Sequence, residues 1–205
     1  LASVIYQKAT GTVTDDQPGF PLTLFSQTIP LKSLSGELQY LFRSPRFNVT
    51  TGLGYSKVNG HIDTTFEGDI PPPDGDGPFQ FQDISGADVQ HTNVYAYAYL
   101  KQLANVIVTA GVSADFLNGD SLQVNGKSQV NPKFGVEWTP LPATTLRAAA
   151  FKVLKRTLVT DQTLEPTQVA GFNQFYDDLN GASSWRYGIG VDQKFAADVF
   201  AGAEF

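Results

Sequence analysis

Apolar and polar residues alternate strictly along much of this chain, and this period of two limits what the chain can fold into. The clearest stretch runs from Val130 to Trp138, where every even-numbered residue is apolar and every odd-numbered residue is polar or glycine. Such alternation puts the two kinds of side chain on opposite faces of a β-strand. Comparable segments predict nine strands, at about residues 2–8, 34–42, 47–55, 93–101, 105–116, 130–138, 144–159, 185–194 and 199–205. A helix over Leu146–Leu158 is the one helical alternative, because its alanines and basic residues also suit a helix.

The predicted connections alternate in length along the chain. Short turns are expected at residues 44–45, 103–105, 140–143 and 196–198, a medium loop at 117–127, and long loops at about 9–32, 67–90 and 160–183. Strands joined by tight turns pair antiparallel, since parallel pairing needs a long crossover. Outer-membrane barrels have short periplasmic turns at one end and longer extracellular loops at the other. The sequence therefore predicts an all-β protein, an antiparallel up-and-down transmembrane β-barrel segment over residues 1–205.

The number of predicted strands indicates part of a larger barrel. Nine is an odd number, whereas bacterial single-chain barrels have an even number of strands. If the short turns are periplasmic, the strand at 199–205 runs outward, and the last strand of a complete barrel should end in the periplasm. We therefore expect an internal piece of a larger barrel, or a barrel that is only partly present in these 205 residues.

The residue types on the apolar faces favour lipid over a protein core as their surroundings. Many are alanines, which would pack poorly between the two sheets of a soluble sandwich: Ala96, Ala98, Ala110, Ala114, Ala148, Ala150, Ala201 and Ala203. Aromatic residues such as Phe42, Trp138 and Trp185 fall near predicted strand ends, where the aromatic girdles of membrane barrels lie. Charged residues make up 17% of the chain, against about 25% in an ordinary soluble domain. A soluble extracellular β-sandwich binding module is the alternative that shares the alternation.

Composition and charge exclude several classes of function. The chain has 20 Asp and Glu against 14 Lys and Arg, which argues against nucleic acid as a partner. It has no cysteine, so disulfides, thiol catalysis and Cys-based zinc sites are excluded. Its two histidines, His61 and His91, lack carboxylates at metal-ligand spacing. We expect no catalytic residue, no metal site and no cofactor, and hence no enzyme.

Charged residues of both signs fall on the polar faces of the predicted strands. We expect these residues to line a water-filled lumen: Glu37, Arg43, Arg46, Lys101, Asp115, Lys133, Glu137, Arg147, Arg186, Asp192 and Lys194. Opposite charges on neighbouring strands could form ion-pair ladders, each worth roughly 0.2–1 kcal/mol. The same charges could set the selectivity of a pore.

The stretch TLVTDQTLEPTQVAGFNQF, residues 157–175, resembles the barrel part of bacterial outer-membrane proteins linked to tetratricopeptide repeats. The resemblance extends over residues 144–195 and implies, by analogy, a role in the export of surface polysaccharide and a periplasmic tetratricopeptide scaffold as a partner. No tetratricopeptide pattern occurs in these 205 residues, and neither a plug domain nor an energy-coupling box of TonB-dependent transporters is visible.

The predicted function is that of a pore or export conduit in the outer membrane of a Gram-negative bacterium, for polysaccharide or small solutes. Membrane lipid and lipopolysaccharide are the expected partners, together with a periplasmic scaffold or another protein subunit. A non-conducting structural barrel that anchors or sheathes a partner protein is the alternative. We expect the loop at 160–183, rich in Phe, Gln and Asn, to fold inward or to contact carbohydrate.

Overall fold

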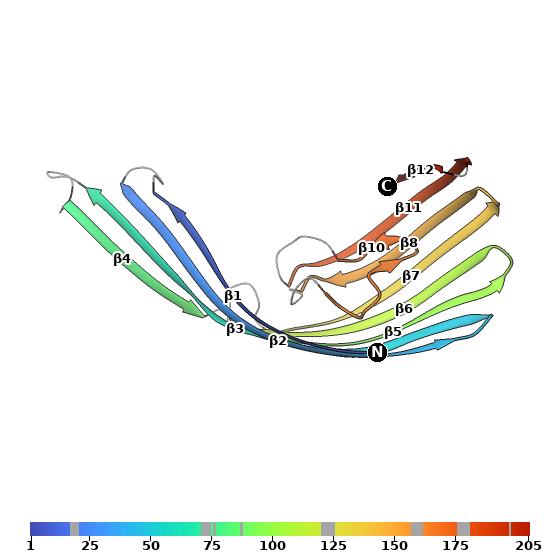
Figure 1. Cartoon of the computed structure of the whole chain (residues 1–205), viewed down its shortest axis with the longest axis horizontal. Coiled ribbons are helices and arrows are strands. Elements are labelled where there is room, and N and C mark those ends of the chain that lie inside the picture. The colour runs from blue at the N-terminus through green and yellow to red at the C-terminus, as the bar shows by residue number, and fades with distance from the viewer. Residues whose placement is uncertain are drawn as a thin grey trace.

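The strands form one large antiparallel sheet (Figure 1). The computed structural model describes residues 1–16, 21–70, 75, 77–86, 88–119, 126–156, 162–175, 181–196 and 198–205. The strands are β1 (Ala2–Asp15), β2 (Leu22–Arg43), β3 (Phe47–Ile70), β4 (Gly77–Gly86), β5 (Val89–Leu103), β6 (Val106–Gly119), β7 (Lys127–Leu141), β8 (Thr144–Leu154), β9 (Gln168–Val169), β10 (Phe172–Asn173), β11 (Ser183–Ala196) and β12 (Val199–Glu204). Within this described part, no helix is long and apolar enough to span a membrane.

The sheet has the up-and-down order predicted from the hairpins. Its path is β1-β2-β3-β5-β6-β7-β8-β11-β12, and each strand pairs antiparallel with its neighbours. All nine predicted strands are present, although the one predicted over residues 144–159 ends at Leu154 and residues 157–159 lie outside the described residues. Thr144–Leu154 is a strand rather than a helix. The sheet is open, because β1 and β12 each pair with one neighbour among the described strands. The short turns gather at one end of the sheet, as Figure 1 shows at the right.

Polar side chains are buried and apolar side chains are exposed, which is the reverse of a soluble protein. On β5 the buried residues are His91, Asn93, Tyr95 and Tyr97, and the alternate residues Thr92, Val94 and Ala96 are exposed. We call the face of His91 the inner face and the face of Val94 the outer face. Large apolar side chains stay exposed along the outer face, among them Val130, Phe134 and Ile189. The soluble sandwich is therefore wrong, because no second sheet in the described residues covers this face.

The expected long loops at 9–32 and 67–90 are wrong in their bounds, because strands fill most of both ranges. β1 continues to Asp15 and β2 begins at Leu22, while β4 pairs with the far end of β3 in one continuous register with β5. These strands were missed because their alternation is short and is interrupted by Gly, Pro and Asp, which are typical of loops. Residues 17–20, 71–74, 76 and 87 of these ranges lie outside the described residues, as do 160–161 and 176–180 of the third expected loop.

We call residues 9–15, 22–31, 59–70 and 77–86 the extension, since they project beyond the other strands opposite the short turns (Figure 1). Its polarity is the reverse of the rest of the sheet. The outer face carries rows of mostly polar residues: Thr12, Thr28 and Asp63, with Ile84 at the end of this row, and then Thr14, Ser26, Thr65 and Gln82. The inner face carries the ring of Phe66, whose centroid lies 5.3 Å from that of Phe25 and 6.3 Å from that of Phe81. The outer surface of the extension is therefore suited to water, not to lipid.

Candidate functional site

A segment between β8 and β11 folds back onto the inner face of the sheet. We call residues 162–175 the inner segment; Figure 1 shows it inside the curve of the sheet, where β9 and β10 form a small hairpin. The two turn residues, Ala170 and Gly171, have φ angles of 48° and 82°. Positive φ at both positions defines the tight turn that suits a two-residue hairpin. The prediction that this region folds inward is confirmed for residues 162–175.

The hairpin tip packs against apolar residues on the inner face of β8. Val169 is fully buried and Ala170 is 3% exposed, and both belong to a cluster with Ala149, Phe151 and Val153 of β8. These three residues form an apolar patch on an inner face that is otherwise mostly polar, and the hairpin covers this patch.

Two glycines of the sheet make room for the hairpin. A Cβ atom added at Gly135 would lie 2.7 Å from the Cβ atom of Ala170, and one added at Gly188 would lie 2.6 Å from the ring of Phe172. Both distances are below van der Waals contact, so any other residue would push the hairpin away. The Arg147 guanidinium lies over the Phe172 ring, 4.9 Å from the ring centroid.

Glu165 is the polar anchor of the inner segment. It is 4% exposed, and its carboxylate accepts hydrogen bonds from the Tyr97 hydroxyl at 2.7 Å, from Asn93 Nδ2 at 3.1 Å and from Arg156 Nη2 at 2.8 Å. A buried carboxylate is stable only when charges and hydrogen-bond donors surround it in this way. Gln174 Nε2 adds a bond of 3.0 Å to the same Tyr97 hydroxyl.

Arg156 links this anchor to a second buried carboxylate. Its Nη1 atom lies 3.3 Å from Asp115 Oδ1, and His91 Nε2 lies 2.8 Å from the same oxygen. Asn131 Nδ2 donates to the other Asp115 oxygen at 2.6 Å. The result is a continuous network of buried polar groups from β5 through β6 and β7, which we call the Glu165 network.

The start of the inner segment is attached to β2. Thr163 Oγ1 donates to Glu37 Oε2 at 3.1 Å, and the backbone N–H of Leu164 donates to the same oxygen. Gln39 Nε2 donates to the Leu164 carbonyl. From Thr163 to Phe172 the segment therefore crosses the inner face from β2 to β11, and Glu165 attaches its middle to β5.

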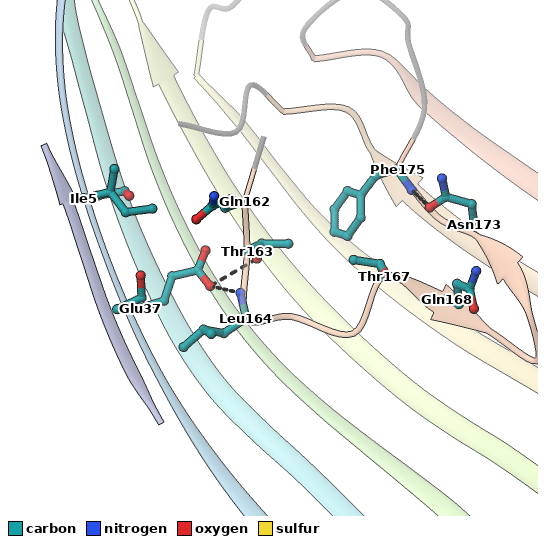
Figure 2. A pocket seen from close by; sticks show the side chains of 11 residues that line it. Ile5, Glu37, Gln162, Thr163, Leu164, Thr167, Gln168, Asn173 and Phe175 are labelled. Carbon is teal, nitrogen blue, oxygen red and sulfur yellow. Dashed lines mark hydrogen bonds between the residues drawn. The ribbon is translucent and has the colours of Figure 1, made fainter. Parts of the chain in front are cut away.

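A cavity of about 540 Å³ opens between the inner segment and the first two strands, as Figure 2 shows. Neutral hydrogen-bonding groups and one aromatic ring dominate its lining: Ser3, Ser35, Gln162, Thr163, Thr167, Gln168, Asn173 and Phe175, with Ile5 and Leu164. Glu37 is the one ionisable residue among the lining residues, and its Oε2 atom is already bonded to the segment. The cavity thus offers amide and hydroxyl groups, with no cation for an anionic ligand.

Part of the predicted lumen set joins this site. Glu37, Asp115, Arg147 and Asp192 hold the inner segment or contact residues that do, and Arg147 Nε lies 2.6 Å from Asp192 Oδ2. Lys133 is 2% exposed, and its ammonium group donates to the Lys152 carbonyl at 3.4 Å. Arg43, Arg46, Lys101 and Lys194 lie near the short turns, Glu137 lies opposite Arg147, and Arg186 lies opposite Phe151. That these residues border a water-filled lumen stays a prediction.

Sequence reasoning missed the uncharged and segment-borne members of the Glu165 network. Asn93 and Tyr97 fall on the polar face predicted for β5, but they carry no charge that would mark them as members of an ion-pair network. Glu165 is the only charged residue from Gln162 to Phe175. A single charge in an otherwise neutral run is the one feature of the sequence that could have indicated a buried ion pair.

The fold defined by these features is that of an outer-membrane β-barrel wall, and solved structures of such proteins resemble it. The copper transporter OprC has a TM-score of 0.61 and 12% sequence identity, over 99% of this chain and 34% of that protein. The siderophore receptor PiuA from Acinetobacter baumannii has a TM-score of 0.63 and 12% identity, over 99% of this chain and 36% of that protein. The chain thus spans about a third of the length of both. No family model and no curated protein matches the sequence.

Proposed function

We propose that the chain is part of an outer-membrane conduit for polar solutes, with the inner segment in the path of the solute. The observation that carries the proposal is the pairing of an exposed apolar outer face with a polar inner face that encloses a polar cavity. Lipid suits the first face, and an aqueous path suits the second. The likeness in fold to a copper transporter and a siderophore receptor is consistent with transport.

The lining of the cavity favours a neutral, hydroxyl-rich solute of the carbohydrate class. The amides of Gln168 and Asn173 are exposed and can donate to and accept from sugar hydroxyls. The ring of Phe175 offers a flat apolar surface to a sugar ring. A phosphate-bearing or carboxylate-bearing solute would meet Glu37 and no cation, so it fits less well.

Conductance of the native full-length protein in planar bilayers tests the proposal. We expect discrete current steps that a neutral maltodextrin interrupts, and we expect the double variant Q168A/N173A to lose most of this interruption. Gln80→Ala, in the extension and away from the cavity, is the matched control and should leave it unchanged. Current steps without interruption by sugar would contradict the substrate class alone.

A non-conducting barrel that anchors or sheathes a partner is the second candidate. It is favoured by the firm attachment of the inner segment, which contacts β2, β5, β7 and β8 and could close the path. Complete absence of current, with correct insertion of the protein, would overturn the conduit and support this candidate.

A further inference from the structure

The outer face changes from apolar to polar at one level of β1, β2 and β3. On β3 the residues Leu53 and Tyr55 are exposed apolar and aromatic groups, and the next residues on that face are Lys57, Asn59 and His61. On β1 and β2 the change follows Tyr6 and Leu34 in the same way. A band of apolar groups that ends in tyrosines and then in lysines is typical of the boundary between acyl chains and headgroups.

Lysines occupy the boundary on all three strands. Lys8 lies directly opposite Lys32 in the β1–β2 register, and Lys57 lies opposite Leu34 in the β2–β3 register. Lys8 and Lys32 are exposed, and Lys57 is partly exposed. Like charges directly opposite each other on neighbouring strands are destabilising unless an anion neutralises them.

No acid among the described residues forms an ion pair with these lysines. Asp88, which lies at the same level between β4 and β5, is bonded to Asn59 Nδ2 and to the Gly60 N–H, at 3.0 Å each. Asp63, farther out on the same face of β3, lies 3.3 Å from His61. The three lysines therefore have no ion-pair partner among the described residues, and their ammonium groups can bind an external anion.

We propose that Lys8, Lys32 and Lys57 form a binding site for the phosphate groups of a lipid headgroup. The site lies where the extension begins, on the side of the sheet away from the short turns, which is the outer-leaflet side if the short turns are periplasmic. Lipopolysaccharide is the phosphorylated lipid of that leaflet, and its headgroup would lie beside the polar outer face of the extension. This site is independent of the conduit, since it faces away from the inner segment.

Binding of lipid A to the native full-length protein in neutral detergent tests the site. We expect bisphosphorylated lipid A to bind, the variant K8Q/K32Q/K57Q to bind about a hundredfold more weakly, and K8R/K32R/K57R to retain binding. The variant R43Q/R46Q/K101Q removes the same charge at the opposite end and should bind normally. Folding of each variant is checked by its heat-dependent gel mobility, and the arginine variant keeps the test valid if the glutamine variant does not fold.

Two further ligands identify the chemistry. Dephosphorylated lipid A should bind about as weakly as the glutamine variant binds lipid A, and millimolar inorganic phosphate should not displace the lipid. Equal binding of both lipids, normal binding by the folded glutamine variant, or displacement by phosphate alone would each overturn the proposal. These outcomes do not depend on conductance, so they are separable from the test of the conduit.

Discussion

At the scale of single residues, Glu165 should contribute most to holding the inner segment in place. Replacement by alanine leaves Arg156, Tyr97 and Asn93 buried without their shared acceptor. Loss of one partner from a buried ion pair typically costs about 3–5 kcal/mol. We therefore expect E165A to release the segment, measured as faster amide hydrogen exchange at residues 163–175 while the strands remain protected.

The control for this experiment is Glu204→Gln. The Glu204 side chain is 62% exposed and lies 3.4 Å from Arg147, so its ion pair is worth about 0–1 kcal/mol. Exchange in the inner segment should be unchanged in this variant. Unchanged exchange in E165A as well would show that the apolar cluster alone fixes the segment.

The sequence predicts the face on which a residue lies, but it does not predict contacts between residues far apart in the chain. Asp115 and Lys133 were placed on the polar face because alternation assigns a face from adjacent residues alone. Glu165 meets Tyr97 and Asn93 across 68 and 72 residues of sequence, and no periodicity brings such groups together. The site was therefore predictable as a polar surface but not as a network.

At the scale of elements, the packing of the β9–β10 hairpin on β7 depends on Gly135. A valine there would place its Cβ atom 2.7 Å from that of Ala170, and overpacking of this kind costs about 1–3 kcal/mol. We expect G135V to displace the hairpin and to make the inner segment sensitive to protease. Gly36→Ala is the control, because its Cβ would lie 3.9 Å from the nearest atom, the Ser3 carbonyl oxygen. Equal protease resistance in G135V and the native protein would contradict this packing.

Strands were predictable where they meet an apolar environment on one face only. β5, β6 and β7 alternate clearly and were found, whereas β4 alternates only from Phe79 to Gln82, after a run rich in Pro, Gly and Asp, and was missed. On β8, the apolar side chains of Phe151 and Val153 face inward, because the hairpin covers them there, and Lys152 between them faces outward. Hydrophobic periodicity therefore reports the surroundings of a strand as much as its presence.

At the scale of the whole molecule, a membrane barrel requires its outer face to be in contact with acyl chains. The two tryptophans of the chain, Trp138 and Trp185, both lie on that face, with 47% and 49% of their surface exposed. Trp138 is near the short turns, and Trp185 is near the opposite end of β11. They therefore report on the two boundaries of the apolar band.

Fluorescence quenching of these tryptophans is the most direct test. The native full-length protein, reconstituted in vesicles, is compared with its W138F and W185F variants so that the emission of each tryptophan is obtained by difference. We predict that lipids brominated on the acyl chains quench both tryptophans and that aqueous acrylamide quenches them weakly. Strong quenching of both by acrylamide, with none by the brominated lipids, would show that the outer face lies in water and would contradict the membrane barrel.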